Sequence, residues 1–112
     1  MGDVLYQELL PKMLTAEPLP LVRETPLSYA TELSRRAQRP VYIKREDTQH
    51  THSFKLRGAM EKLRAMGTLG RRRGVIAASA GNHAQGVAVA ARHYDCAATI
   101  VMPTTTPQIK VD

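Results

Sequence analysis

The chain has 112 residues, of which 43% are hydrophobic, and this is enough to form one small domain. Its single cysteine excludes an intramolecular disulfide and indicates a reducing compartment, while the net charge of +6 leaves a nucleic-acid partner open. The N-terminus does not match a secretory signal and no apolar run approaches the roughly 20 residues of a membrane span, so we expect a cytoplasmic protein with no membrane partner.

Residues 1–24 are predicted to form an N-terminal extension. Apolar residues near helical spacing predict a short helix at its start, which Pro11 should end or kink. The segment from Glu17 to Pro26 contains three prolines and is expected to run extended over a surface. We expect residues 25–112 to belong to a different unit, which carries the chemistry.

The first regular elements of this unit are a helix and a strand. The pattern from Ser28 to Ala37 predicts a helix with Ser28 as its N-cap. Pro40 should stop this helix, and Val41 to Lys44 read as a short strand.

A second helix has the most regular apolar pattern in the chain. Ser53 is predicted to be its N-cap, and Gly67 to be its C-terminal cap. Residues 68–74 should then form a polar connection. The face predicted to point inward consists of Leu56, Ala59, Met60, Leu63 and Met66.

The remaining elements predict a parallel βαβ unit. Val75 to Ala78 and Ala97 to Met102 are apolar strands, and a helix from Ala84 to Tyr94 connects them. Ala84, Val87, Ala88 and Ala91 should face inward, and Cys96 should be a small core residue. The fold class is therefore α/β, with ligands expected at the edge where the first strand ends. Pro103 to Pro107 prepares a further helix start.

Lys55 is the first candidate for chemistry. It lies near the start of a predicted helix, where the positive end of the helix dipole disfavours an ammonium group. Partial burial beside Phe54 would act in the same direction, and a neutral amine can form a Schiff base with a carbonyl compound. The alternative is that Lys55 is a solvated helix residue and Phe54 a core residue or a stacking partner for a planar cofactor.

The second candidate is the turn SAGNHAQG, Ser79 to Gly86. Its small residues allow a ligand to approach the backbone, and the amides that open the following helix suit a carboxylate or a phosphate. Asn82 could hydrogen-bond a ligand and His83 could carry a proton. Their alternative roles are an N-cap and a first-turn helix residue.

Together, the two stretches resemble a known family. KREDTQHTHSFKLRGA, followed by GVIAASAGNHAQGVAVAA and ATIVMPTTTPQIKVD, is similar to the N-terminal part of the threonine ammonia-lyases (threonine deaminases). These belong to the tryptophan-synthase-β-like, fold type II group of pyridoxal-phosphate enzymes. The resemblance covers about Thr25 to Asp112 and implies an incomplete fragment of that group's three-layer fold.

The resemblance also implies residue roles. Lys55 would bind pyridoxal 5'-phosphate as a Schiff base, and Phe54 would pack against the pyridine ring. Asn82 would hydrogen-bond the cofactor's 3-hydroxyl, and the substrate carboxylate would be held by Ser79, Ala80, Gly81, Asn82 and His83. The implied reaction removes the α-proton and the β-hydroxyl of an amino acid, and threonine would give 2-oxobutanoate and ammonia, the first step of isoleucine biosynthesis.

His52 favours one type of enzyme within the family. It precedes SFK, as in biosynthetic threonine deaminases, whereas catabolic threonine deaminases, serine dehydratases and serine racemases more often have Gly there. Serine turnover is expected as a side activity, because one methyl group discriminates only about 10 to 200-fold. A homo-oligomer is expected for a full-length enzyme.

The glycines limit the prediction. Family members hold the cofactor phosphate in a glycine-rich loop, but the seven glycines of this chain are isolated. We therefore expect the chain to be a truncated, catalytically inactive and marginally folded part of such an enzyme.

Two non-enzymatic interpretations stay open. One is a basic nucleic-acid-binding protein that uses Arg71 to Arg73. Because few aromatic residues are present to stack on bases, we expect the chain to have no nucleic-acid partner. The other is an interaction fragment that docks on a full-length homologue through an open sheet edge. The histidines at 50, 52 and 93 are too irregularly placed to predict a metal site.

Overall fold

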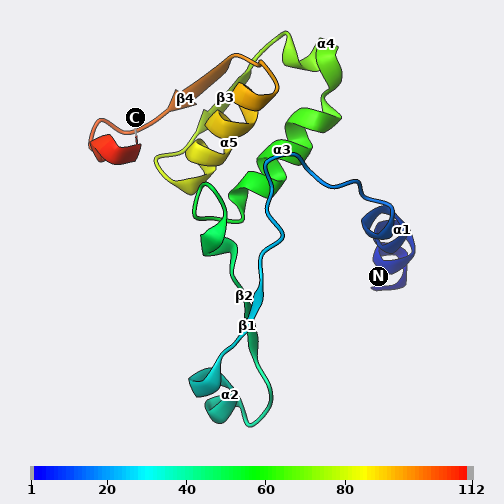
Figure 1. Ribbon diagram of the computed structural model, residues 1–112. Helices are drawn as coiled ribbons and strands as arrows, with labels where there is room; N and C mark the ends of the chain where they lie inside the picture. The colour runs from blue at the N-terminus through cyan, green and yellow to red at the C-terminus, as the bar shows by residue number, and fades with distance from the viewer. Residues whose placement is uncertain (1, 111–112) are drawn as a thin grey trace.

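The computed structural model describes residues 2–110, so Met1, Val111 and Asp112, at the outer ends of the two predicted segments, lie outside the described residues. Helices and strands are interspersed along the chain, and three helical elements follow one another between β2 and β3 (Figure 1). In order, they are α1 (Gly2–Leu14), β1 (Leu27–Tyr29), α2 (Thr31–Ala37), β2 (Tyr42–Lys44), η1 (Glu46–Thr48), α3 (Lys55–Ala65), α4 (Gly67–Arg71), β3 (Val75–Ala78), α5 (Asn82–His93), β4 (Ala98–Val101) and η2 (Gln108–Lys110).

The hydrophobic core lies between α3 and α5, which pack side by side next to the two strands β3 and β4 (Figure 1). On α3, the predicted inward face is confirmed at four of its positions, since Leu56, Ala59, Met60 and Leu63 are buried. Met66 is only half-buried because α3 ends at Ala65. Cys96 is buried in the same cluster, which confirms its predicted core position.

The predicted parallel pair is confirmed. β3 and β4 run parallel, and Val75 is opposite Ala98 at one end while Ala78 is opposite Val101 at the other. α5 connects them but begins at Asn82, before the predicted start at Ala84. The prediction for its inward face is wrong at Ala88, which is exposed. Gly86 and Ala90 are among the buried residues of α5 instead. The reason is that α5 turns its Gly86 face, rather than its Ala88 face, toward α3.

The predicted N-cap at Ser28 is wrong. Ser28 lies in β1, which pairs antiparallel with β2 and places Ser28 opposite Ile43. The helix is shorter than predicted and begins at Thr31. The pairing of two distant segments overrides the local helical pattern, because it satisfies backbone groups that a longer helix would have used.

Two further predictions about helix ends need correction. α1 continues through Pro11 to Leu14, so the proline does not end it. Pro11 lies in the last turn, where it removes a single helical hydrogen bond, and its carbonyl still accepts from the Thr15 amide at 3.0 Å. Residues 68–74 are not only a connection, because Gly67–Arg71 forms α4. Gly67 does adopt the left-handed conformation, with φ 63°, expected of a residue that ends α3.

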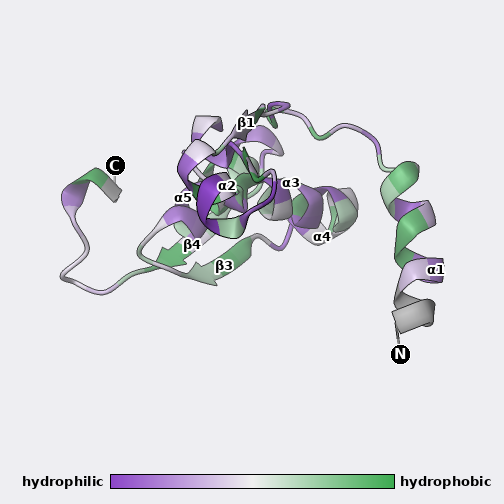
Figure 2. Ribbon diagram, turned by 90° about the horizontal axis from the view of Figure 1, so that it is seen from below, coloured by the Kyte–Doolittle hydropathy of each residue, from purple (hydrophilic) through white to green (hydrophobic). Residues whose placement is uncertain are grey.

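The molecule is extended rather than spherical. Its radius of gyration is 17.2 Å, whereas a compact chain of this length would have about 13 Å. The β1–β2 hairpin projects from the α3–α5 core, and α1 lies apart from it at the end of a long connection (Figures 1 and 2). Within residues 2–110, no helix is both long and apolar enough to cross a membrane.

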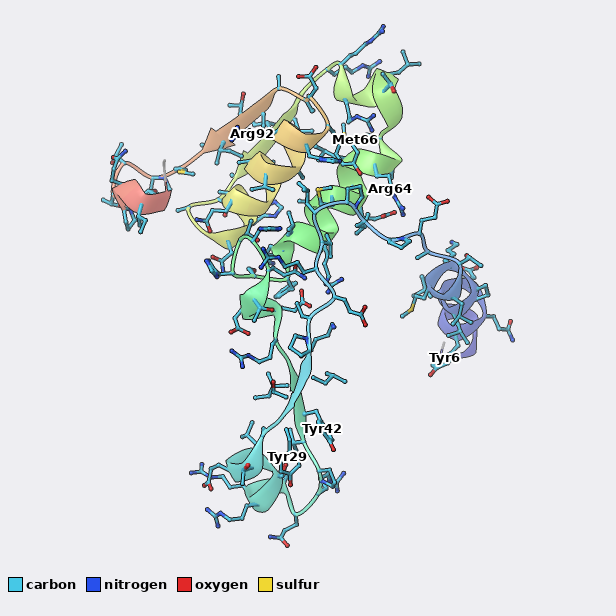
Figure 3. All side chains as sticks on the ribbon, in the orientation of Figure 1. Tyr6, Tyr29, Tyr42, Arg64, Met66 and Arg92 are labelled. Carbon is cyan, nitrogen blue, oxygen red and sulfur yellow. The ribbon has the colours of Figure 1, made fainter. Side chains whose placement is uncertain are left out.

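The projecting hairpin has an aromatic contact of its own. Tyr29 on β1 and Tyr42 on β2 lie beside each other (Figure 3), with ring centroids 5.4 Å apart in an edge-to-face arrangement. Both rings are more than half exposed. The pair stabilises the two short strands without help from the core.

Candidate cofactor site around Lys55

The turn before α3 is built around Ser53. Its side chain is buried, and its hydroxyl accepts a hydrogen bond of 3.2 Å from the backbone N–H of Lys55. The prediction that Ser53 occupies the N-cap position is nevertheless wrong, because α3 begins at Lys55 and Phe54 precedes it. Lys55 is therefore the first residue of the helix, where the backbone amides of the first turn point outward.

Lys55 and Phe54 are both exposed, and the lysine Nζ lies 5.0 Å from the centroid of the phenyl ring. The expected partial burial of Lys55 is wrong, as is a core position for Phe54, which is 59% exposed. The reason is the direction of the first turn, in which Leu56 points into the core and its two predecessors point away. An amine and an aromatic ring are thus available together to an incoming ligand.

The second stretch forms the turn between β3 and α5. Ser79 is held against the neighbouring strand by a hydrogen bond from its amide to the Val101 carbonyl, at 3.0 Å. Its hydroxyl accepts from the Gly81 amide at 3.3 Å, which closes the turn. Gly81 occupies the N-cap position of α5, so Asn82 is the first helical residue and not the cap. Asn82 and His83 are exposed, and Ala80 is half-buried.

Gly86 brings the two stretches together. It is buried on α5, and a Cβ added to it would lie 3.2 Å from both the carbonyl carbon and the carbonyl oxygen of Lys55. This approach is tighter than most Cβ contacts, so a side chain at this position would require the backbone of α3 to shift by a few tenths of an ångström. The N-terminal half of α5 is consequently packed directly behind the backbone of Lys55.

A charged pair that includes a residue of the first turn of α3 was not predicted as part of the site. Glu46 accepts two hydrogen bonds from the Arg57 guanidinium, from Nη2 at 2.8 Å and from Nε at 2.9 Å. These bonds, with further ones from Thr25 and Gln49, lower the pKa of Glu46 to about 2. Glu46 precedes the loop that leads into α3, and Arg57 follows it. Their separation of eleven residues, across a loop, matches no helical or strand spacing that would predict a contact.

An open cavity of about 430 Å³ lies next to the loop that precedes α3. Residues from three parts of the chain line it: His50, Thr51 and His52 from the loop, Ala84, Gln85, Ala88 and Val89 from α5, and Ile100, Met102 and Ile109 from the C-terminal part. His52 adopts a left-handed backbone conformation with φ 51°. Its ring Nδ1 lies 3.0 Å from the Asp47 carbonyl oxygen. In the described part of the chain, no group of acidic, histidine or cysteine residues is arranged to hold a metal ion.

Within the basic run Arg71–Arg73, Arg71 packs into the fold, whereas Arg72 and Arg73 are exposed. Arg71 donates to the Leu63 carbonyl at 2.9 Å, and its guanidinium lies 4.8 Å from the centre of the Tyr94 ring. The side chain that starts the run thus ties the end of α3 to the end of α5.

Sequence comparison identifies relatives at high identity. A biosynthetic L-threonine dehydratase of Burkholderia multivorans is 53% identical over 103 residues, which is 92% of this chain and 20% of that protein. The chloroplastic biosynthetic threonine dehydratase 2 of Solanum lycopersicum is 50% identical over 111 residues, which is 99% of this chain and 18% of that protein. The chain spans about a fifth of the length of these curated relatives.

Structural comparison also finds a threonine deaminase, together with a serine racemase. The processed form of threonine deaminase isoform 2 from Solanum lycopersicum superposes with a TM-score of 0.80 at 48% identity, covering 100% of this chain and 31% of that one. Maize serine racemase superposes with a TM-score of 0.75 at 35% identity, covering 82% and 28% respectively. The predicted α/β class and fold type II group are therefore confirmed.

The family described as pyridoxal-phosphate dependent enzyme matches residues 19–112, which is most of the chain. The match includes both stretches described above, with the exposed amine of Lys55 and the turn from Ser79 to His83. The cofactor predicted from the sequence is the one that gives this family its name. On this evidence, the chain belongs to the pyridoxal-phosphate-dependent enzymes.

Proposed function

We propose that this chain supplies the lysine-bearing part of an enzyme that deaminates threonine to 2-oxobutanoate and ammonia, the first step of isoleucine biosynthesis. The observation that carries the proposal is the exposed amine of Lys55 next to the exposed ring of Phe54. Relatives named as biosynthetic threonine dehydratases, about 50% identical to this chain, support the choice of threonine.

The residues present fit the aldehyde and the pyridine ring of pyridoxal phosphate. A primary amine reacts with the cofactor's aldehyde, and the Phe54 ring offers a flat apolar surface to a pyridine ring. Lys55 meets the first need because nothing buries its side chain. The isolated glycines offer no equivalent for the phosphate group, and we propose that its binding loop is not encoded in these 112 residues.

When bound, the cofactor supplies the electron sink that makes loss of an α-proton possible. In our proposal, Lys55 would hold the cofactor through its aldehyde, and its amine would accept the substrate α-proton. Phe54 would lie against the pyridine ring, and Asn82 would hydrogen-bond the 3-hydroxyl. The substrate carboxylate lies against Ser79–His83, where the start of the twelve-residue helix α5 favours a negative charge.

The proposed reaction is balanced without an oxidant. Threonine loses its α-proton and its β-hydroxyl as water, and one water is taken up when the nitrogen leaves as ammonia. The net change is therefore threonine to 2-oxobutanoate plus ammonia. The expected homo-oligomer and the cytoplasmic location stay predictions, and three of the plant relatives are named as chloroplastic.

A chimaera tests the proposal. Residues 19–112 of this chain would replace the matching segment of the Burkholderia multivorans threonine dehydratase, and the product formed from threonine would be measured. We expect 2-oxobutanoate and ammonia from the chimaera and neither from its Lys55→Ala variant. A chimaera that folds and binds the cofactor but leaves threonine unchanged would contradict the proposal.

The same chimaera separates the alternative activities. Pyruvate from serine at a higher rate than 2-oxobutanoate from threonine would indicate a serine dehydratase, and D-serine would indicate a racemase. The unmodified 112-residue chain is expected to release no ammonia from threonine. Ammonia release from that chain, lost in Lys55→Ala, would show that the expected inactivity is wrong.

A further inference from the structure

Glu46 lies at the centre of a hydrogen-bond network that includes the first turn of α3. Besides its two bonds from Arg57, one carboxylate oxygen accepts from the Thr25 hydroxyl at 2.6 Å. The other oxygen accepts from the Gln49 side-chain amide at 3.3 Å. Each oxygen of the carboxylate therefore has two donors, and the Glu46 side chain is only 16% exposed.

Gln49 extends the network to a third segment. Its side chain is 1% exposed, and it accepts from the Arg23 amide at 3.0 Å while donating to the Arg23 carbonyl at 2.8 Å. Arg57 also donates to that carbonyl, at 3.2 Å. The chain entering β1, the loop after β2 and the start of α3 are thus fastened to one another through a single carboxylate.

The network controls the rotation of α3. Successive residues of an α-helix are about 100° apart around its axis, so Lys55 and Arg57 project in directions about 200° apart. Holding Arg57 against Glu46 therefore fixes the direction in which Lys55 leaves the helix. Gly86 holds the backbone of Lys55 from behind, and Ser53 holds its amide. Without Arg57, the first turn would be free to fray, as helix ends do.

An exposed charge group elsewhere provides the contrast. On α2, Glu32 accepts from Arg35 and Arg36 at 2.8 Å, but more than half of each side chain is exposed. Such surface pairs contribute little to stability. The Glu46 pair differs because its carboxylate is mostly buried and the side chains bonded to it come from three segments of the chain.

We propose that Glu46 and Arg57 are positioning residues for Lys55, and that their paired side chains hold the first turn of α3 so that the amine faces an incoming aldehyde. Neither residue touches the reacting atoms. The proposal rests on the proposed function for the identity of the aldehyde, but its claim concerns the orientation of Lys55.

The test measures the reactivity of Lys55 in the 112-residue chain. Pyridoxal 5'-phosphate is added, the amine adds to its aldehyde carbon with loss of water, and borohydride reduces the resulting C=N bond to a stable amine. Peptide mapping then gives the labelling rate of Lys55 relative to Lys62, an exposed lysine on the same helix. This ratio does not depend on turnover or on protein concentration, and circular dichroism of each variant shows that equal folded fractions are compared.

Three variants are compared with the unmodified chain. Glu46→Gln removes the charge, Arg57→Lys keeps the charge but loses the two-pronged contact, and Glu32→Gln is the matched control. We expect the Lys55 to Lys62 ratio to fall between about 5-fold and 100-fold in the first two variants. The ratio should not change in Glu32→Gln. Hydrogen exchange at the amides of residues 55–58 should become faster in the same two variants.

The outcomes separate this inference from the proposed function. If Lys55 reacts faster than Lys62 in the unmodified chain and the ratio is unchanged in Arg57→Lys and Glu46→Gln, the positioning role is overturned and the proposed function is not. If Lys55 reacts no faster than Lys62 in the unmodified chain, the positioning role is overturned, whereas the proposed function is decided by the product that the chimaera forms from threonine. Circular dichroism identifies a variant that fails to fold. If Glu46→Gln is such a variant, the labelling ratio of the milder Arg57→Lys alone decides whether the positioning role holds.

Discussion

Gly86 lies directly against the carbonyl group of Lys55, at a distance where a methyl group would already be too close. A Cβ at this position would approach the Lys55 carbonyl oxygen to 3.2 Å and the Leu56 amide nitrogen to 3.3 Å. These neighbours are backbone atoms and cannot rotate away as a side chain could. The spacing between α3 and α5 is therefore set at the residue that carries the reactive amine.

Gly86→Ala should push the two helices apart. We expect the free energy of unfolding to fall by about 1–3 kcal/mol, the usual cost of overpacking, relative to Gly58→Ala. Gly58 is the matched control, because it lies inside α3 and a Cβ there meets nothing within 4 Å. Gly58→Ala should stabilise the chain by up to about 1 kcal/mol. Urea unfolding measures both, and equal stability of the two variants would contradict the close approach.

The left-handed backbone of His52 makes a second prediction. A residue with a Cβ pays roughly 1–2 kcal/mol for this conformation, whereas glycine adopts it freely. Comparing His52→Gly with His52→Ala cancels the loss of the ring contact to Asp47, which both variants lack. We expect the glycine variant to unfold at a higher urea concentration, by about 1 kcal/mol in free energy. A more stable alanine variant would argue against φ 51°.

The pKa of Glu46 predicts a dependence on pH. The carboxyl has a pKa of about 2 in the folded chain against an ordinary value of 4.5, because Arg57 and its other donors favour the ionised form. The ionised pair therefore stabilises the fold fully above about pH 4.5, and this contribution is lost as the pH falls towards 2. It is on the order of 2 kcal/mol.

Thermal or urea unfolding of the unmodified chain and Glu46→Gln checks this. The difference in free energy of unfolding between the two should be largest near neutral pH and should shrink as the pH falls below about 4.5. Glu32→Gln, on the exposed helix α2, should differ little from the unmodified chain at any pH. A difference for Glu46→Gln that stays constant with pH would contradict the ionised pair.

Leu56→Ala measures how much one buried side chain contributes to the stability of the small core. Its side chain is fully buried at the contact of α3 with α5, and Leu56→Ala should cost about 2–5 kcal/mol. Leu69 on α4 is the control, because it is 78% exposed and its replacement by alanine should change stability by less than about 0.5 kcal/mol. Unfolding followed by circular dichroism distinguishes them. Two equal losses would mean that the core does not lie between these helices.

The elements predicted best from the sequence are those whose residues interact locally. The apolar spacing along α3 and the apolar runs of β3 and β4 predicted their type and most of their bounds. Gly67 ended α3 as expected, because its left-handed conformation is a property of a single residue. For the site, the sequence placed the reactive lysine at a helix start, and this is where the structure has it.

The incorrect predictions depend on partners that are distant in the sequence. Ser28 joins a strand because β2 is available to pair with it, and a local pattern contains no information about β2. Ala88 is exposed and Gly86 buried because the position of α3 decides which face of α5 is covered. The bond between Glu46 and Arg57 spans a loop, and two charged residues in a sequence do not indicate that they meet.

The β1–β2 hairpin, which stands clear of the core, makes the chain tolerant of engineering at one end. The segment between its two strands consists of α2, whose C-cap is Gln38, and a short loop, and Figure 1 shows α2 at the end of the hairpin away from α3. Exposed loop tips accept inserted sequence with little effect on the structure that supports them. A fluorescent label or an affinity tag inserted beside Gln38 would therefore report on the chain while Lys55 and the start of α3 stay undisturbed.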